Sequence, residues 1–364
     1  MIKAYCFYSG NGGWSSHARS FLGALARLES IALIPWDGPL NPDSLTYVSK
    51  QMLMNAKGAE TNGPSLGIGP IELMQRMTGS LRVGFVVWET SIIPADKIKI
   101  LRGLDEIWTP SEWGRRLLVR NGFPDSKVFV VPEGVDTNLF EPHPRDGSSV
   151  QRPFRFLCVG KWEARKGIDD LVRAYSAEFG AAEPVELVLH CFNRYLPHLD
   201  PENRVQQLVS GSHAAIRISQ PCGLTELTGL YAKADAFVLP ARAEGWGLPI
   251  MEAMACGLPV IVTDYSAPVD YIHSGNAYPI RVDRMVDVFD PDFFPAGREM
   301  GQWAQPDISH LRYLMRHVFT NSQEAAEKGQ IARKDVCERW TWKYAATIAH
   351  RRLRPELYAR AGSS

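Results

Sequence analysis

The segment that most constrains the fold of this chain runs from residue 236 to residue 260. It opens with the apolar run AFVL at residues 236–239, passes Pro240 and a glycine-punctuated stretch, and then changes to helix-forming residues. A short apolar run bounded by proline and glycine and followed by a helical segment predicts a strand, a loop and a helix N-terminus. Such a helix start offers free backbone N–H groups to an anion.

Two carboxylates stand at a fixed spacing in this segment. Glu244 opens the loop and Glu252 follows eight residues later, about two helical turns away if the helix has begun. One carboxylate can face a reacting centre while the other accepts a hydroxyl. The alternative is a buried helix start without function, but a simple core helix does not need two carboxylates and the two glycines Gly245 and Gly247 around it.

Residues 244–260, EGWGLPIMEAMACGLPV, resemble the Glu-x7-Glu signature of retaining glycosyltransferases of family 4, with Trp246 in place of the usual phenylalanine. The resemblance implies an α/β protein with the GT-B fold. In that fold two doubly wound Rossmann-like domains face each other across a cleft, and a C-terminal helix crosses back to the N-terminal domain. It also implies a retaining hexosyltransferase that uses a nucleotide-diphosphate sugar.

The length, charge balance and cysteine spacing of the chain are consistent with this resemblance and exclude other classes of protein. The chain has 364 residues, which favours about two domains. Its 40 basic and 40 acidic residues cancel, so no global field draws it to nucleic acid. The six cysteines are scattered without a C-x-x-C pair, which favours buried free thiols in a reducing compartment over zinc or redox chemistry.

No targeting or membrane-spanning segment is expected. Met1 leads directly into a strand-like run, and no apolar run approaches the ~18 residues of a membrane span. We therefore expect a cytoplasmic protein. The basic tail HRRLRPELYAR, residues 350–360, is read as a solvated face by default, with peripheral contact to the inner face of a membrane as the alternative.

A glycine-rich loop follows the apolar run at residues 2–8. It has the form G-x-G-G-x-x-x-H and lacks the third glycine of the dinucleotide fingerprint, which disfavours a nicotinamide cofactor. The loop resembles the GGxxxH opening of the same family. That resemblance implies that Gly12 and Gly13 approach the donor and that His17 binds substrate, although a lone histidine in a first helical turn is more often packed.

A second loop, GKWEARKG at residues 160–167, follows the apolar run 154–159 and precedes a helix. Its cations Lys161, Arg165 and Lys166 suit a diphosphate, because they neutralise its charge while N–H groups align with it. A solvated basic loop is the alternative. The loop resembles the family segment G-R-x4-K-G with lysine at position 161, which implies that Lys161 and Lys166 take part in catalysis and that Arg165 shares the diphosphate.

Glu89 lies just past the predicted strand of residues 81–88, where polar groups gather in doubly wound sheets. The surrounding VVWETSIIP resembles the WE-containing branch of the family, as do residues 105–116 and 131–140. We expect Glu89 to bind a substrate hydroxyl, with a structural ion pair as the alternative.

Three regions complete the expected organisation. The polar, Pro- and Gly-rich residues 141–153 mark a linker, so we expect domains at 1–145, 146–340 and 341–364, the first binding acceptor and the second donor. The Gly- and Pro-rich region 39–70 is interpreted as an acceptor-facing loop with one helix near 44–54. Residues 283–305 are interpreted as a loop without chemistry.

The family resemblance implies a role for each candidate residue. Lys161, Lys166 and the N–H groups around Gly245, Gly247 and Leu248 would hold the diphosphate, Glu252 the donor ribose, and Glu244 the transferred sugar. We expect no metal and no cofactor beyond the nucleotide-sugar donor. The implied acceptor is a saccharide or a lipid-linked glycan of the cell envelope, and the oligomeric state stays open.

Two alternatives remain open at this stage. One is a nucleotide-sugar-binding or nicotinamide-binding module without transfer activity. The other is an epimerase or a phosphorylase of the GT-B fold.

Overall fold

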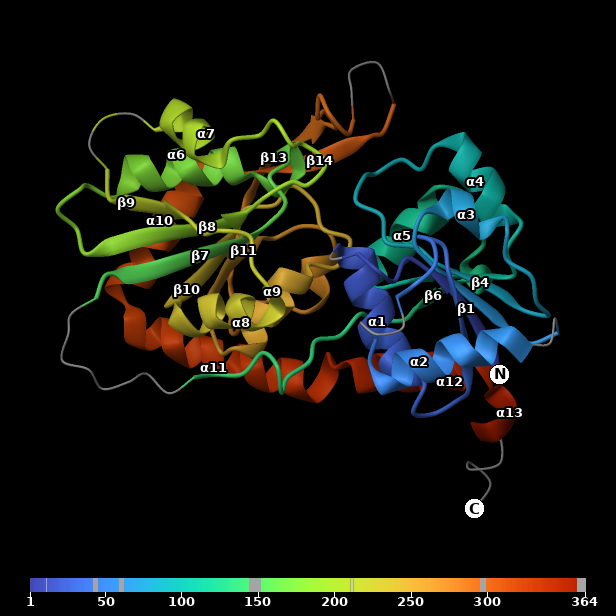
Figure 1. The fold of residues 1–364 in the computed structure, drawn as a ribbon. Helices are drawn as coiled ribbons and strands as arrows, with labels where there is room; N and C mark the ends of the chain where they lie inside the picture. The colour runs from blue at the N-terminus through green and yellow to red at the C-terminus, as the bar shows by residue number, and fades with distance from the viewer. Residues whose placement is uncertain are drawn as a thin grey trace. The chain divides into compact units, whose positions relative to one another are not determined.

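The computed structural model describes residues 1–10, 12–41, 45–58, 62–143, 152–209, 211, 213–294 and 299–358. Strands and helices alternate along these residues (Figure 1). They form two compact units. The first contains Met1–Trp88, Ile92–Gly134 and the chain from Arg339 onward, and the second contains Glu89–Ser91 and Val135–Glu338.

The first unit is built on a six-stranded sheet of order β2-β1-β3-β4-β5-β6, with every neighbouring pair parallel. The strands are β1 (Ile2–Cys6), β2 (Ile31–Pro35), β3 (Ser65–Ile68), β4 (Arg82–Phe85), β5 (Glu106–Thr109) and β6 (Val128–Val130). Strand β2 lies on one side of β1 and strand β3 lies on the other, so the strand order reverses direction at β1. Ligands of doubly wound sheets bind beyond the carboxyl ends of the strands at such a switch point.

Helices cover both faces of this sheet (Figure 1). They are α1 (Gly13–Leu25), α2 (Tyr47–Asn55), α3 (Ile71–Met74), α4 (Ala95–Arg102), α5 (Glu112–Arg120), α12 (Trp342–Leu353) and α13 (Pro355–Tyr358), with short 3₁₀ turns at Ala56–Gly58 and Asp125–Lys127. Ser111 caps the N-terminus of α5, because its side chain accepts the backbone N–H of Gly114. The C-terminal α12 packs against α1.

The second unit is built on a six-stranded parallel sheet of order β12-β11-β10-β7-β8-β9. The strands are β7 (Phe154–Gly160), β8 (Val185–Cys191), β9 (Ala215–Ile218), β10 (Ala236–Leu239), β11 (Val260–Thr263) and β12 (Tyr278–Ile280). Counted along the chain this is the order 3-2-1-4-5-6 of a dinucleotide-binding fold. Its switch point lies between the neighbouring strands β7 and β10.

Helices again lie on both faces of the second sheet (Figure 1). They are α6 (Ile168–Glu178), α7 (Pro201–Leu208), α8 (Leu224–Lys233), α9 (Leu248–Ala255), α10 (Ile308–Thr320) and α11 (Ser322–Arg339), with 3₁₀ turns at Ala164–Lys166 and Ala267–Asp270. A separate antiparallel hairpin, β13 (Val282–Asp287) and β14 (Gln302–Pro306), follows the last strand.

Three sequence interpretations need correction. Residues 283–305 are not simply a loop, because they contain most of β13 and β14; strand β13 is largely exposed, so it lacks the apolar alternation that would have marked it. The region 39–70 contains the buried strand β3 as well as α2. The sequence also predicts one last helix from about Trp340 to Arg360, whereas α12 ends at Leu353 and the short helix α13 follows separately.

The second unit also takes in residues N-terminal to the expected linker, whose residues 144–151 lie outside the described part of the chain. Residues 135–143 group with the second unit rather than the first. The ring of Phe140 packs edge-on against Tyr231 at 5.5 Å, and Arg333 donates to the Phe140 carbonyl at 3.3 Å. In the described parts of the chain, no helix combines the length and apolar character that a membrane crossing requires.

Candidate functional site

The predicted basic loop and the predicted Glu244 loop lie beside each other in the second unit. The first follows β7 and leads through the turn at Ala164–Lys166 into α6, and the second follows β10 and leads into α9. Because β7 and β10 are neighbours in the sheet, their carboxyl ends bring the two loops to the switch point. The topology thus joins segments that are about 80 residues apart in the sequence.

Gly167 fixes the contact between these loops. It has φ +66°, a conformation that side-chain-bearing residues rarely adopt, and a Cβ placed there would meet the Pro240 carbonyl oxygen at 2.3 Å. Beside it, the backbone N–H of Arg242 donates to the carbonyl of Arg165 at 2.7 Å. A glycine at the end of the basic loop is therefore required for the loop to reach the end of β10.

Glu244 lies at the centre of the site and is 4% exposed. Its Oε1 accepts from Lys166 Nζ at 2.5 Å, and its Oε2 accepts from Arg165 Nη1 at 3.3 Å. Its backbone N–H donates to Ser266 Oγ at 2.8 Å. Two cations and a fixed backbone therefore hold this carboxylate in one orientation.

Arg165 ties the cluster together. Besides Glu244 it donates to the Ala243 carbonyl at 2.7 Å and to Glu163 Oε1 at 2.6 Å. Burial lowers the pKa of this guanidinium, but the neighbouring carboxylates raise it by more, so the pKa of Arg165 lies above its ordinary value. Burial likewise raises the pKa of Glu163, but Arg165 and the nearby lysines hold that pKa below its usual range. Arg165 and Glu163 therefore carry opposite charges at neutral pH.

Lys161 is the most accessible cation of the basic loop. Its side chain is 47% exposed, whereas those of Arg165 and Lys166 are 7% and 8% exposed. Its Nζ lies 3.7 Å from Glu163 Oε2 and 5.9 Å from the centre of the Tyr195 ring. The structure therefore separates the three predicted cations into two buried ones paired with carboxylates and one at the surface.

Glu252, the second glutamate of the segment, lies on α9. Its side chain is half-buried and accepts a hydrogen bond from the Tyr231 hydroxyl at 2.7 Å. Burial raises the pKa of this carboxyl from 4.5 to about 7, and the hydrogen bond from Tyr231 opposes that rise. The two glutamates of the Glu-x7-Glu segment therefore differ in environment, one held by cations and the other by a hydroxyl.

The start of α9 has the geometry expected for an anion site. Gly247 is its N-cap with φ +100°, and Leu248 is the first helical residue. A Cβ at Gly247 would approach the Tyr271 hydroxyl at 2.8 Å, and that hydroxyl donates to the Trp246 carbonyl at 2.7 Å. Gly245 lies in the same loop, whose backbone is therefore fixed by packing that only glycine permits.

Glu89 groups with the second unit and meets the same cluster. Its Oε1 lies 3.6 Å from Arg165 Nη2, and its side chain is 31% exposed. The carboxylate is thus held at one oxygen by an ion pair while part of it faces solvent. Both interpretations made for Glu89, a hydroxyl ligand and an ion pair, agree with this placement.

The other predicted residues lie in the first unit. Gly12 is the N-cap of α1, and Gly13 begins the helix at a position where a Cβ would meet no atom within 4 Å. His17 is 1% exposed, stacks on Trp342 at 5.6 Å, and has its Nδ1 3.2 Å from Glu133 Oε1. Its ring is therefore enclosed by the first unit, and contact with a substrate would require those rings to move.

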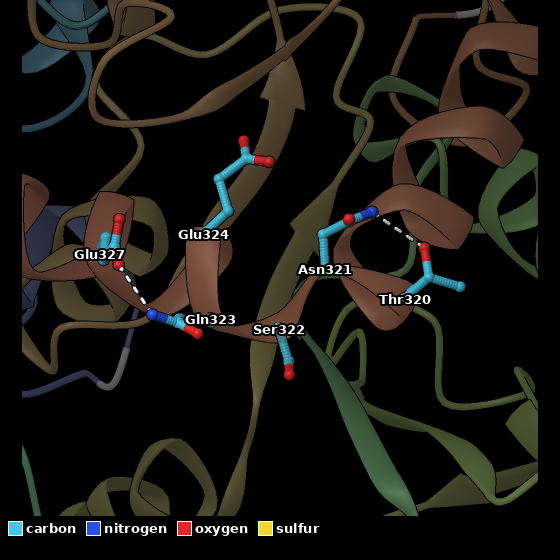
Figure 2. A pocket seen from close by; sticks show the side chains of 6 residues that line it. All are labelled: Thr320, Asn321, Ser322, Gln323, Glu324 and Glu327. Carbon is cyan, nitrogen blue, oxygen red and sulfur yellow. Dashed lines mark hydrogen bonds between the residues drawn. The ribbon is translucent and has the colours of Figure 1, made fainter.

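A surface pocket elsewhere in the second unit does not share this chemistry. It lies where α10 ends and α11 begins, and Figure 2 shows its lining residues Thr320, Asn321, Ser322, Gln323, Glu324 and Glu327. Gln323 donates to Glu327 at 3.4 Å, and Asn321 donates to Thr320 at 3.0 Å. With two carboxylates and no cation in its lining, this pocket is unsuited to a diphosphate.

Sequence reasoning did not single out several residues of the site. Glu163 lies inside the basic loop, between Lys161 and Arg165. An acidic residue between two cations was the signal that could have indicated its ion pair with Arg165. Ser266 has φ +61°, rare outside glycine, and its hydroxyl both accepts from Glu244 N–H and donates to the Tyr265 carbonyl at 2.7 Å. Nothing in the sequence around Ser266 marks that conformation. Among the described residues, no group of three or more His, Cys, Asp or Glu side chains is placed to hold a metal ion.

Comparison with known proteins agrees with this geometry. Residues 153–292, which contain β7 to β12 and both loops of the site, match the family model described as glycosyl transferases group 1. A D-inositol 3-phosphate glycosyltransferase of Catenulispora acidiphila is 27% identical over 207 residues, 54% of this chain and 48% of the relative. An MMP α-(1→4)-mannosyltransferase of Mycolicibacterium hassiacum is 24% identical over 253 residues, 68% of this chain and 53% of the relative.

The chain thus spans about half the length of these two curated relatives. Among solved structures it is similar to HepE of Anabaena in complex with UDP-glucose. The TM-score is 0.67 at 13% identity, covering 98% of this chain and 99% of that chain. This likeness concerns the fold, and it confirms the predicted class of two Rossmann-like units of the GT-B type.

Proposed function

We propose that the chain is a retaining glycosyltransferase using a nucleotide-diphosphate sugar, starting from the match of residues 153–292 to the family model described as glycosyl transferases group 1. The observation that carries the proposal is the buried cluster of Glu244, Lys166 and Arg165 at the switch point of the second sheet. A site of this kind is built to handle charge in a transition state.

Sugar transfer separates charge along the bond that breaks. The anomeric carbon gains positive, oxocarbenium character, and negative charge gathers on the leaving diphosphate. We assign the diphosphate to Lys161 and to the N–H groups of Gly247 and Leu248 at the start of α9. Preorganised donors of this type stabilise developing charge without reorganising during the reaction. Gly245 lies in the same loop and belongs to this part of the site.

Lys166 is suited to act at both ends of the breaking bond. An ammonium group carries three donors, and Glu244 takes one of them at 2.5 Å. The remaining donors are available to a phosphate oxygen. Glu244 in turn would accept a hydroxyl of the transferred sugar and stabilise its positive charge. Lys166 and Glu244 are far apart in the sequence, and their direct contact links the proposed phosphate ligand to the proposed sugar ligand.

Glu252 and the second unit are assigned to the nucleotide. Its half-buried carboxyl would accept hydrogen bonds from the donor ribose while keeping the contact with Tyr231. In the proposed mechanism the acceptor hydroxyl attacks on the leaving-group side, and its proton passes to a phosphate oxygen of the donor. No separate general base and no metal ion take part in this scheme.

The acceptor is assigned to the first unit and is proposed to be a saccharide or a lipid-linked glycan of the cell envelope. The names of the two relatives, a glycosyltransferase and a mannosyltransferase, support sugar transfer in general. Peripheral membrane contact would use the basic C-terminal tail. Two of the basic residues in the C-terminal tail pair within the first unit, Arg352 with Glu106 at 2.7 Å and Arg354 with Glu29 at 3.0 Å. Absence of binding to anionic vesicles at low salt would remove the membrane version.

The test uses water as the acceptor, because the natural acceptor is not identified. Wild-type protein is incubated with UDP-glucose or GDP-mannose, and release of the nucleoside diphosphate is followed with Glu244→Gln in parallel. We expect release by the wild type and at least ~100-fold slower release by the variant. The control is Glu324→Gln, whose carboxylate is 46% exposed on α11. Equal rates for wild type and Glu244→Gln would take Glu244 out of the site.

The same reaction separates the alternatives. A phosphorylase would form a sugar phosphate only when free phosphate is added, and an epimerase would change the sugar without releasing the nucleotide. A binding module would bind the nucleotide sugar and leave it intact.

A further inference from the structure

The β13–β14 hairpin has a structural role at the site that the sequence did not indicate. Its second strand, Gln302–Pro306, carries Trp303, which is 1% exposed. The ring packs edge-on against Phe294 at 5.4 Å. A buried tryptophan points to a specific contact, because its indole N–H needs an acceptor.

That acceptor belongs to the segment that carries Glu89. Trp303 Nε1 donates to the Glu89 carbonyl oxygen at 2.9 Å, and the backbone N–H of Gln302 donates to Ser91 Oγ at 2.8 Å. Two consecutive hairpin residues therefore hold both ends of the three-residue segment Glu89–Ser91. This segment groups with the second unit although its neighbours in the chain, Trp88 and Ile92, group with the first.

The fixed backbone sets the position of the Glu89 carboxylate. Its Oε1 lies 3.6 Å from Arg165 Nη2, the guanidinium that also contacts Glu244. Glu89 has no other ion pair or side-chain hydrogen bond among the described residues, and its side chain is 31% exposed. Beside the charged cluster, the carboxylate therefore retains the capacity to accept a hydrogen bond from a ligand.

The same hairpin also supports the two loops of the site. Asp290, in the connection beyond β13, accepts the backbone N–H of Ala164 at 2.8 Å. The backbone N–H of Ala304 donates to the Arg242 carbonyl at 3.1 Å, and Gln305 accepts from Arg242 Nε at 3.1 Å. The hairpin therefore contacts every segment that contributes a charge to the cluster, so its contact with Glu89 is part of a common framework.

We propose that Trp303 is a positioning residue of the sugar subsite: it holds Glu89 beside Arg165 so that the free carboxylate oxygen accepts a hydroxyl of the transferred sugar. This inference rests on the proposed function. It adds that recognition of the donor's sugar depends on a hairpin outside the two Rossmann-like sheets. Affinity for the nucleotide part of the donor does not depend on this hairpin.

The test compares ligands that differ only in the sugar. UDP, UDP-glucose, GDP and GDP-mannose are each titrated by calorimetry into the wild type and into Trp303→Phe, which keeps an aromatic ring and removes the N–H. The affinity of each nucleoside diphosphate is compared with that of its sugar nucleotide. We expect the nucleoside diphosphate to bind within about twofold of wild type. The sugar nucleotide should bind about tenfold more weakly. In donor hydrolysis, kcat/KM should fall by about the same factor.

Two further variants keep the test decisive if Trp303→Phe is poorly folded. Ser91→Ala removes the second anchor without touching the core, and we expect a loss of about threefold for the sugar nucleotide alone. Met285→Ala, on the exposed side of the same hairpin, should leave both ligands unchanged; Met285 is 40% exposed. In a double-mutant cycle, adding Trp303→Phe to Glu89→Ala should cause no further loss.

The outcomes separate this inference from the proposed function. If Trp303→Phe and Ser91→Ala bind both ligands like wild type, or weaken both equally, Trp303 does not position a sugar ligand. If the wild type itself binds no nucleoside diphosphate, the proposed function fails instead.

Discussion

Lys166 Nζ lies 2.5 Å from Glu244 Oε1, and both side chains are less than one-tenth exposed. A buried ion pair gains from attraction what it loses in desolvation, so its net effect on stability is small while both partners are present. Removal of one partner is different, because the other charge then remains buried and uncompensated. Loss of either side chain should therefore lower both the stability of the fold and the proposed transferase activity.

The first prediction concerns this pair. Lys166→Met keeps the volume of the side chain and removes its charge, leaving Glu244 with Arg165 alone at 3.3 Å. We expect a loss of about 2–4 kcal/mol in the free energy of unfolding, measured by urea denaturation. The control Lys328→Met removes a lysine whose Glu324 partner is 46% exposed at 3.5 Å, and should cost less than about 1 kcal/mol. Equal losses in the two variants would contradict the buried-pair account.

The second prediction concerns the pH dependence of stability. Burial raises the pKa of Glu252 from 4.5 to about 7, so between these values the folded protein binds more protons than the unfolded chain. Stability from this group is therefore complete below about pH 4.5 and is lost as pH rises to about 7. Glu252→Gln is neutral throughout, so between pH 5 and pH 8 it should gain up to about 3 kcal/mol relative to wild type.

The measurement for Glu252 is urea unfolding at several values of pH from 5 to 8, with wild type and Glu252→Gln in matched buffers. The variant keeps an acceptor for the Tyr231 hydroxyl, so loss of that hydrogen bond does not obscure the comparison. Parallel stability curves for the two proteins would show that Glu252 has an ordinary pKa.

The third prediction uses two glycines as a matched pair. Gly167→Ala places a Cβ 2.3 Å from the Pro240 carbonyl at φ +66°, so it should destabilise the protein by about 1–3 kcal/mol and weaken nucleotide binding. Gly13→Ala places a Cβ in open space at the start of α1, and should be neutral or stabilise by up to about 1 kcal/mol. Thermal unfolding of both variants tests this, and a neutral Gly167→Ala would mean that the two loops are not held as described.

The fourth prediction concerns the exposed cation of the basic loop. Lys161→Ala should weaken binding of the nucleoside diphosphate about tenfold, with a smaller effect at high salt, because Lys161 is 47% exposed and its charge is screened. Lys161→Arg should retain or improve binding, since a guanidinium offers a bidentate fork to phosphate. Unchanged affinity in Lys161→Ala, measured by calorimetry at two salt concentrations, would place the diphosphate elsewhere.

Much of the second unit could be predicted from local patterns. The run at residues 236–239 is apolar throughout and is bounded by Pro240, and it forms β10 with those limits. The change to helix-forming residues after Gly247 likewise marks the start of α9. Both signals are local, so one sequence is enough to detect them.

The parts that were missed depend on partners distant in the sequence. Strand β3 is four residues long and lies in a Gly- and Pro-rich region, so only its pairing between β1 and β4 identifies it. The buried guanidinium of Arg165 is balanced by ion pairs with Glu89, Glu163 and Glu244, and these carboxylates come from three separate segments. The proposed role of Trp303 follows from a contact with Glu89 across 214 positions of the sequence. Local patterns carry none of this information.

Binding of a nucleoside diphosphate in the absence of metal is the sharpest test of the proposed donor site. UDP, GDP, ADP and TDP are screened by thermal shift with EDTA and with magnesium, and the monophosphate CMP is included for comparison. We expect one clear diphosphate hit in EDTA, with about 2.7 kcal/mol of stabilisation at ~100 times the dissociation constant. No shift with any of them, or a shift with a nicotinamide cofactor instead, would contradict a metal-independent nucleotide-sugar transferase.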